Sequence, residues 1–542
     1  MKPDSDLSIS DVDLADPRMI MMTTEGEITG LISGIKASGA AGPDGIDHYL
    51  LKRLTKKAIC RLVLIFNACL TISYFPQTWK LSWVNMIQKS GKDASQSANY
   101  RLISLCSTLG KILEKLFLKL LNKFIDDNGL RRGRQCGFAK GRSAQESIIK
   151  LSDDVANAFK QGREVVGVFI DMEKAFDKLW HEGVLFKLST EGAPRPLIKI
   201  IASFLKGRKF QIKDGEILST LRDLLASAPQ GGTSSPNIYT YFTHDVPGSD
   251  TIDALCNWSD GSSYADDNAE WRSFFKSEAA YRIAIMEIQR YLTALADWGS
   301  RWKLLPSPAK TEAMIFSQPN SPNRKRQVDL YLYGQKIRTV KEVRFLGALY
   351  DQGLTWSNHI DKLVQKATPR SIQICRLAKT FSRNEHRLVG QLINALIISL
   401  FDYSSVAWIT AADSQWSKIN QSQLRTLKVL LRVPRRTSNE AVLNRVNTGT
   451  YREIISNRAA KRFVNINKAN NNLVKFQSRC VESNRDHRQR SPFEVLTEMA
   501  DLDDILNETK CVTCTYSHDT PFFRLNKPNI IRLCPIHRSQ QA

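Results

Sequence analysis

One stretch of this sequence restricts the fold more than any other: an apolar, β-branched run, Val165–Ile170, that ends in the carboxylate of Asp171. A run of this length and composition is typical of a buried β-strand. Two more carboxylates, Asp266 and Asp267, lie between two short segments that could each form a strand, which predicts the tip of a hairpin. The chain is therefore expected to place one carboxylate at a strand end and two at a hairpin tip.

A hairpin tip beside that strand end would gather three carboxylates, which repel one another unless cations lie among them. Hard oxygen ligands suit Mg²⁺, which keeps several waters and shares substrate phosphates. Two such ions, about 3.5–4 Å apart, stabilise the attacking and leaving oxygens of an in-line phosphoryl displacement. An isolated Asp-Asp pair is more often a solvated turn, because Asp bonds its own backbone there. The neighbouring sequence must decide between the two interpretations.

Several further motifs occur in a fixed order around these carboxylates. They are FIDMEKAFDKLWHEG from Phe169, APQGGTSSP from Ala228, YADD from Tyr264, SPAKTEAMIF around Lys310 and FLG from Phe345. This ordered set resembles the palm motifs of reverse transcriptases, most closely those of Jockey-type non-LTR retrotransposons. The resemblance extends over roughly residues 35–360.

The resemblance implies roles for the acidic residues and for one lysine. Asp171, Asp266 and Asp267 would be catalytic and would hold two Mg²⁺ (or Mn²⁺) ions. Lys310 would lie near the pyrophosphate leaving group, where its amine acts as a general acid or stabilises charge. The alternative for Lys310 is an ordinary exposed lysine.

Five further residues are substrate-binding candidates. Lys89 and Arg101 would clamp the incoming triphosphate, since the Arg fork grips phosphate oxygens in two places; most Lys and Arg are simply surface cations. Phe176 matches the aromatic residue that collides with a ribose 2′-hydroxyl, although a buried aromatic after a strand is more often core. Gln230 would contact the incoming nucleotide, and Gly231 would permit close backbone approach.

The sequence departs from the family at three places. Leu102 replaces the usual Pro, and Ser234 replaces the usual Leu, which predicts a modest loosening of its loop. The segments around YADD, 258–263 and 268–271, are more polar than usual. Either the hairpin is short or this copy has drifted.

Composition narrows the class of partner. The chain has 542 residues, 77 Lys and Arg, 54 Asp and Glu, and a net charge of +23, an excess that commonly marks a polyanion partner. Ten cysteines without a signal-like N-terminus indicate reduced thiols inside a cell. No apolar stretch reaches transmembrane length without charges, so no membrane partner is expected. The expected location is intracellular, in the nucleus, the cytoplasm or both.

We expect an α+β fold, the right-hand polymerase of fingers, palm and thumb, with an α-helical C-terminal part and a small zinc-binding module. The expected zinc ligands are two knuckle-spaced pairs, Cys511 with Cys514 and Cys534 with His537. The predicted parts are a flexible leader (1–30), fingers (31–160), palm (161–320), primer-grip hairpin (321–360), helical thumb (361–468), linker (469–495) and zinc module (496–542).

The resemblance implies an RNA-directed DNA polymerase that adds dNTPs to a primer 3′-hydroxyl during target-primed reverse transcription. Its partners would be template RNA and primer or target DNA. The family usually carries an upstream endonuclease domain, for which this chain has no room, so nicking activity is not expected. Two alternatives stay open: a catalytically lapsed nucleic-acid-binding protein, which the polar hairpin favours, and an RNA-dependent RNA polymerase, which Phe176 opposes.

Overall fold

The computed structural model describes residues 22–36, 39–89, 91, 93–96, 99–131, 134–139, 141–173, 175–224, 226–248, 259–381, 386–469 and 491–499. The chain divides into two compact units. Unit 1 comprises residues 1–138, 170–252 and 291–310, and unit 2 comprises residues 139–169, 253–290 and 311–542. Both contain helices and strands, so the fold is mixed α and β. The units cut across the predicted fingers, palm and thumb ranges, and those ranges stay predictions.

Unit 1 is built on a sheet with the strand order β2-β1-β4-β5, to which β6 adds by pairing with β4. Its strands are β1 (Leu81–Gln88), β2 (Tyr100–Cys106), β4 (Arg208–Asp214), β5 (Ile217–Leu218) and β6 (Arg222–Leu224). Its helices are α1 (Glu25–Ser33), α2 (His48–Leu51), α3 (Lys56–Thr71), α4 (Thr108–Asp127), α6 (His181–Thr190), α7 (Arg195–Leu205) and α8 (Ser235–Phe242), with a 3₁₀ turn at Gln77–Trp79.

Helix α4 supplies much of the core of unit 1, and the four-residue spacing of apolar residues from Ile112 to Ile125 predicts a helix there. Its apolar side chains recur every three or four positions and are buried, as expected for a helix with one face in the core. Ser107 begins the helix, because its hydroxyl accepts from the amide of Gly110. Helix α1 begins at Glu25, capped by Thr24, and therefore starts inside the range predicted as a leader.

Unit 2 contains a five-stranded sheet in the order β12-β9-β3-β8-β7. Its strands are β3 (Arg163–Asp171), β7 (Ser259–Tyr264), β8 (Asp267–Phe275), β9 (Glu312–Phe316) and β12 (Arg338–Thr339). Two separate hairpins follow: β10 (Tyr331–Leu332) pairs with β11 (Gln335–Lys336), and β13 (Glu342–Phe345) pairs with β14 (Ala348–Asp351). Helix α10 (Glu278–Trp302) contributes to both units.

The strand predicted to end at Asp171 is confirmed as β3, which lies in the middle of this sheet. Every residue from Arg163 to Ile170 is buried. A strand covered on both faces needs an uninterrupted apolar run rather than alternation, which is what the sequence has.

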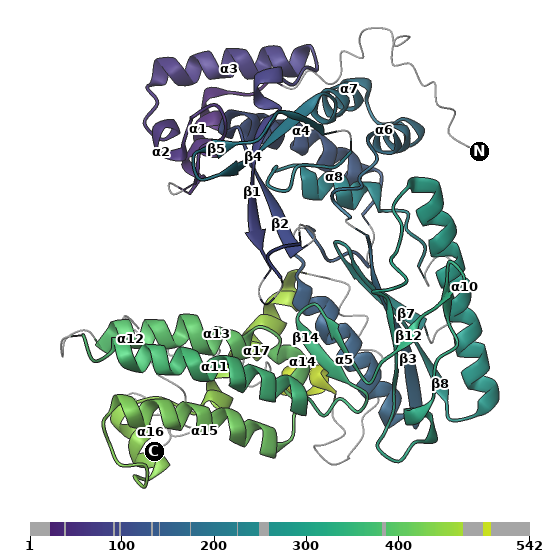
Figure 1. Ribbon diagram of the computed structural model, residues 1–542, viewed down its shortest axis with the longest axis vertical. Helices are drawn as coiled ribbons and strands as arrows, with labels where there is room; N and C mark the ends of the chain where they lie inside the picture. The colour runs from purple at the N-terminus through teal and green to yellow at the C-terminus, as the bar shows by residue number, and fades with distance from the viewer. Residues whose placement is uncertain are drawn as a thin grey trace, which may run out of the picture. The chain divides into compact units, whose positions relative to one another are not determined.

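The rest of unit 2 is helical, and its helices gather in Figure 1 beside α5 and the sheet. They are α5 (Ala144–Lys160), α11 (Ser357–Leu377), α12 (His386–Ile393), a π-helical turn (Asn394–Ile398), α13 (Ser399–Asp402), α14 (Ser405–Trp408), α15 (Asp413–Leu430), α16 (Asn439–Val446) and α17 (Tyr451–Ala469). Residues 492–499 form a further helical segment. Its Phe493 and Leu496 are buried, and the amide of Phe493 donates to Asp153 of α5, so the end of the predicted linker packs in the core.

Trp356, His359 and Ile360 also belong to the core of unit 2. Trp356 is buried against Tyr350, and the carboxylate of Asp351 accepts from the amides of Thr355 and Trp356. His359 is buried, and burial lowers its pKa to about 4, so the ring is neutral. Its Nδ1 accepts from the amide of Leu349, and its other nitrogen therefore donates to the hydroxyl of Ser404.

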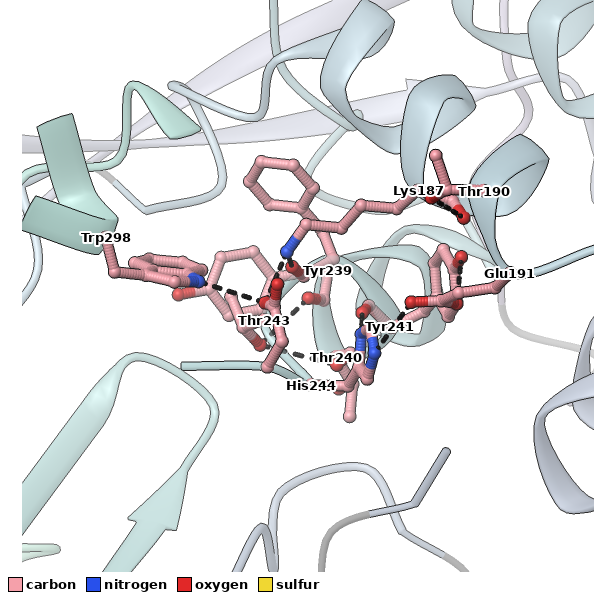
Figure 2. Close-up of polar contacts among 11 residues, drawn as sticks. Lys187, Thr190, Glu191, Tyr239, Thr240, Tyr241, Thr243, His244 and Trp298 are labelled. Carbon is pink, nitrogen blue, oxygen red and sulfur yellow. Dashed lines mark hydrogen bonds and ion pairs between the residues drawn. The ribbon is translucent and has the colours of Figure 1, made fainter. Parts of the chain in front are cut away.

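In unit 1, a buried lysine links three helices (Figure 2). The Nζ atom of Lys187 on α6 donates to the carbonyl of Phe242 at 2.6 Å and pairs with Asp245. It also lies 4.1 Å from the ring centroid of Trp302 and 5.2 Å from that of Trp298, both on α10. A carboxylate, a carbonyl and two ring faces together compensate the loss of water around the ammonium.

Replacing Lys187 should therefore destabilise unit 1 strongly. We expect Lys187→Ala to lower the free energy of unfolding by about 3 kcal/mol, since breaking a buried pair leaves polar groups without partners. The matched control is Lys178→Ala, whose ion pair with Glu173 is more exposed and should cost less than ~1 kcal/mol. Equal midpoints in urea unfolding of the two variants would contradict this interpretation of Lys187.

No helix in the described ranges is both long enough and apolar enough to cross a membrane.

Candidate active site

The first predicted catalytic carboxylate, Asp171, is the last residue of β3 and is held by a lysine. Lys310 Nζ lies 2.8 Å from Asp171 Oδ2, and the Lys310 side chain is otherwise largely exposed. Two backbone hydrogen bonds hold the segment before Lys310 against the end of β3. The amide of Ser307 donates to the carbonyl of Asp171 at 2.8 Å, and the amide of Glu173 donates to the carbonyl of Leu305 at 3.0 Å. The structure therefore brings together two of the four predicted catalytic residues.

The other two carboxylates are at the tip of the β7–β8 hairpin, as predicted. Six residue pairs join the strands, from Ser259 opposite Arg272 to Tyr264 opposite Asp267, which leaves a two-residue turn. The first turn residue, Ala265, has a φ of 59°, the left-handed conformation that tight hairpin turns require. Asp266 is partly buried and Asp267 is exposed. The hairpin has a full ladder, so the interpretation that it is short is wrong.

The carboxylates are distributed over neighbouring strands. β3 ends at Asp171, and the next strand in the sheet, β8, begins at Asp267. Carboxylate oxygens are the ligands that Mg²⁺ and Mn²⁺ prefer, and the ammonium of Lys310 shows that Asp171 accepts a cation. Within the described ranges, however, no group of three or more His, Cys, Asp or Glu side chains is arranged to hold a metal ion.

The APQGG loop is fixed tightly against β2. The amide of Ser104 donates to the carbonyl of Gln230 at 2.7 Å. Gly231 has a φ of 135°, and a Cβ atom there would lie 2.2 Å from the carbonyl oxygen of Ser104. Only glycine fits this backbone and this space. The Gln230 side chain donates to Asp177 at 3.2 Å, so Asp177 positions the predicted nucleotide contact.

The predicted sugar gate, Phe176, lies in an aromatic stack next to this loop. Its ring centroid is 4.7 Å from that of the buried Tyr239 and 6.2 Å from that of Phe138. The carbonyl of Phe176 accepts from the amide of Ala228 in the APQGG loop at 3.2 Å. Phe176 is partly buried, so its ring is supported from behind and remains accessible.

The two predicted triphosphate ligands lie on the β1–β2 hairpin. Arg101 is opposite Ile87, and two residues further along the amide of Lys89 donates to the carbonyl of Asn99. Side chains two residues apart on a strand share a face, so Lys89 and Arg101 are diagonal neighbours on one face of the hairpin. Arg101 is exposed, and Leu102 continues the regular ladder opposite Met86 despite replacing the family's proline.

The motifs described so far lie in a region that matches one family. Residues 87–349 match the family described as reverse transcriptase (RNA-dependent DNA polymerase). This stretch of the chain is similar to a reverse transcriptase domain. The stretch includes Lys89, Asp171, Asp266 and Lys310 with the loops between them.

Its relatives are polymerases of insect transposable elements. The chain is 29% identical to the protein named "Probable RNA-directed DNA polymerase from transposon BS" of Drosophila melanogaster, over 80% of this chain and 47% of that one. It is 27% identical to the RNA-directed DNA polymerase from mobile element jockey of the same organism, over 86% of this chain and 50% of that one. The chain thus spans about half the length of these relatives.

A solved structure of apo telomerase from Candida tropicalis, truncated from its C-terminal domain, is also similar, with 10% identity and a TM-score of 0.35 over 51% of this chain and 54% of that one.

Ser234, one of the departures from the reverse transcriptase pattern, does not loosen its loop. Its amide and its hydroxyl both donate to the buried carboxylate of Glu114 on α4, at 2.8 and 2.9 Å. A leucine could not form the hydroxyl bond to Glu114. The predicted loosening is therefore wrong, because the lost apolar contact is replaced by a hydrogen bond to a buried acid.

Sequence reasoning missed Tyr403, which lies in the helical part of unit 2, beyond the matched residues 87–349. Its hydroxyl donates to the carbonyl of Leu346 in the FLG motif at 3.1 Å, and its ring packs on Gly347. Burial, then the charges of Tyr264 and Asp267, raise the pKa of Tyr403. A lone tyrosine outside the shared motifs carries no sequence signal of this role.

The predicted zinc ligands Cys511, Cys514, Cys534 and His537 lie outside the described residues, and the zinc site stays a prediction.

Proposed function

We propose that this chain is an RNA-directed DNA polymerase of a non-LTR retrotransposon, which adds dNTPs to a primer 3′-hydroxyl during target-primed reverse transcription. The observation that carries the proposal is the Gln230–Gly231 loop, which is fixed by Ser104 and Asp177 beside the accessible ring of Phe176. A loop with no side chain at Gly231 lets backbone and nucleotide approach closely. The family match and the relatives' names support the same reaction.

In this proposal Asp171, Asp266 and Asp267 hold two Mg²⁺ or Mn²⁺ ions, which would stabilise the attacking and leaving oxygens of the phosphoryl transfer. Lys310 would leave Asp171 for the leaving pyrophosphate when the substrate binds, because a triphosphate is the stronger anion. Its ammonium can then donate a proton or stabilise charge there. Lys89 and Arg101 would bind the triphosphate from the β1–β2 hairpin.

The partners in the proposal are template RNA and primer or target DNA, which the net charge of +23 would attract. The two units would supply fingers, palm and thumb, with the helices α11 to α17 as the thumb. An intracellular location, in the nucleus or the cytoplasm, and a C-terminal zinc module that contacts nucleic acid complete the proposal.

The second candidate, a lapsed reverse transcriptase that only binds nucleic acid, rested on the polar hairpin. Three polar side chains of the hairpin have defined partners: Asp260 pairs with Lys150, Ser262 with Ser147 and Arg272 with Glu287. A drifted hairpin would instead accumulate buried groups without partners. The hairpin gives no support for lapsed activity.

Phe176→Ala should relax sugar selection, because removing the ring from its place on Tyr239 opens space for a 2′-hydroxyl. We expect the ratio of kcat/KM for dNTP to that for NTP to fall by about 10²-fold, within the range of sterically based discrimination. Single-nucleotide extension with dTTP and UTP in parallel measures this ratio. Phe138→Ala, which removes the ring on the outer side of the stack, is the matched control and should change the ratio far less. An unchanged ratio for Phe176→Ala would mean that the ring is core packing.

A further inference from the structure

The helix α5 carries three side chains that bond to the hairpin bearing Asp266 and Asp267. Lys150 Nζ donates to the carboxylate of Asp260 at 2.5 Å and to the carbonyl of Gly261 at 3.0 Å. Ser262 Oγ donates to Ser147 Oγ at 2.7 Å. Trp271 Nε1, on the second strand, donates to the carboxylate of Asp154 at 2.9 Å.

These contacts share one geometry. Positions 147, 150 and 154 recur at helical spacing and lie on one face of α5. On the hairpin, Asp260 and Ser262 alternate along β7 and so point to one face, and Trp271 is the cross-strand partner of Asp260. The contacts therefore join one helix face to one hairpin face. The next cross-strand pair on that hairpin face is Tyr264 with Asp267, at the tip.

We propose that Lys150 and Asp154 are positioning residues, which set the place of the Asp266–Asp267 turn through Asp260 and Trp271. The proposal rests on the proposed function, in which that turn is catalytic. It explains why a strand face that is usually apolar is polar in this chain.

The physical reason is directionality. Apolar contacts have no preferred direction. A strand that is held by an apolar face can therefore shift slightly without losing buried apolar area. Hydrogen bonds weaken steeply with angle and distance, and a buried polar group that loses its partner bears the full cost of desolvation. Trp271, Ser262 and Ser147 are almost completely buried, so water cannot replace the lost partners. A catalytic carboxylate misplaced by ~1 Å can cost roughly 10²-fold in rate.

The charges at this contact make it sensitive to pH. Burial, and then the negative charge of Asp260, raise the pKa of Asp154 to about 7, against the opposing effects of Lys150 and of the Trp271 hydrogen bond, while Asp153 raises it further. The folded state therefore binds this proton more tightly than the unfolded state, and stability is lost as the pH rises from about 4 towards 7. The asparagine side chain of the Asp154→Asn variant has no ionisable proton, and that part of the pH dependence should disappear.

The test measures primer extension by the full chain, with kcat and KM for dNTP, the Kd for an RNA–DNA duplex, and the thermal midpoint of each variant. We expect Lys150→Met and Asp154→Ala to lower kcat by roughly 10- to 100-fold, with KM and Kd within about twofold. Asp154→Asn still offers an oxygen to Trp271, so its kcat should stay within about threefold of wild type. Its thermal midpoint should lose the part of the pH dependence between about pH 4 and 7 that comes from Asp154.

The matched control is Lys160→Met, which removes an ion pair of similar burial from the same helix, with Glu494 instead of the hairpin. It should lower the thermal midpoint about as much as Lys150→Met and leave kcat unchanged. Equal kcat losses in these two variants, or equal losses in Asp154→Asn and Asp154→Ala, would overturn the proposal. If Lys150→Met does not fold, the two Asp154 variants decide. A wild-type chain that does not extend a primer would instead contradict the proposed function.

Discussion

We expect Asp266→Asn to lower primer extension by roughly 10³-fold or more, while RNA binding stays within about twofold of wild type. The substitution removes one negative charge and keeps the size of the side chain, so the two-residue turn between Tyr264 and Asp267 has no reason to change. In the proposed site that charge helps to hold a divalent cation whose stabilisation of the transition state is several kcal/mol, and each 1.4 kcal/mol is tenfold in rate. The loss should appear in kcat. Single-turnover extension at saturating dNTP measures it.

The matched control is Asp329→Asn, because Asp329 is an exposed acid that pairs with Lys336 and belongs to none of the quoted motifs. It should extend primers as wild type does. Asp171→Asn should resemble Asp266→Asn, and Asp267→Asn should cost less if Asp267 mainly supports its neighbour. Near-wild-type extension by Asp266→Asn would contradict the assignment of the hairpin tip as catalytic.

We expect Gly231→Ala to abolish detectable extension and to destabilise unit 1 by about 3–5 kcal/mol. The added methyl group would lie 2.2 Å from the carbonyl oxygen of Ser104, which belongs to the β2 backbone and cannot rotate away. A φ of 135° adds strain that is tolerated almost only by glycine. The loop would have to leave β2, and Gln230 would lose its place beside Asp177. Urea unfolding and extension by the same preparation measure both effects.

Gly215→Ala separates conformational strain from collision. Gly215 also has a positive φ, 58°, but a Cβ atom there has nothing within 4 Å. That substitution should cost only about 1 kcal/mol and should leave extension intact. If Gly231→Ala costs no more than Gly215→Ala, the close approach of the loop to β2 is not a constraint.

Much of the fold follows from patterns that are local in the chain. The apolar run before Asp171 predicts β3 because a central strand is covered on both faces, and the four-residue spacing from Ile112 predicts α4. The hairpin tip follows from adjacent small acids between strand-like segments. These elements are predictable because one periodicity or one turn determines each of them.

The errors arose where a residue's role depends on a partner far away in the sequence. Ser234 looked like a weakened apolar contact because its partner, Glu114, is 120 residues earlier. The hairpin looked drifted because the partners of Asp260 and Trp271 are on α5, more than a hundred residues away. The pattern of a single sequence shows which residues are polar and how they are spaced. It does not show which polar group forms a hydrogen bond with which other group.

The same limit applies to helix faces. The spacing of Leu424, Leu427, Leu430 and Leu431 predicts one apolar helix face, yet in α15 Leu427 shares the buried side with Gln423 and Thr426. Gln423 is buried because its amide donates to the carbonyl of Gly449 and accepts from the amide of Tyr451. A polar side chain that forms hydrogen bonds with two backbone groups can lie in the core. The sequence of the helix does not show which backbone groups those are.

The most direct test of the account is DNA synthesis by the purified wild-type chain on an RNA template of defined sequence, with a DNA primer, Mg²⁺ and either dNTPs or NTPs. The account predicts a full-length complementary DNA with dNTPs and little or no product with NTPs. Tight binding of the primer–template without extension would show a nucleic-acid-binding protein, and efficient extension with NTPs would show an RNA polymerase; either result contradicts the account.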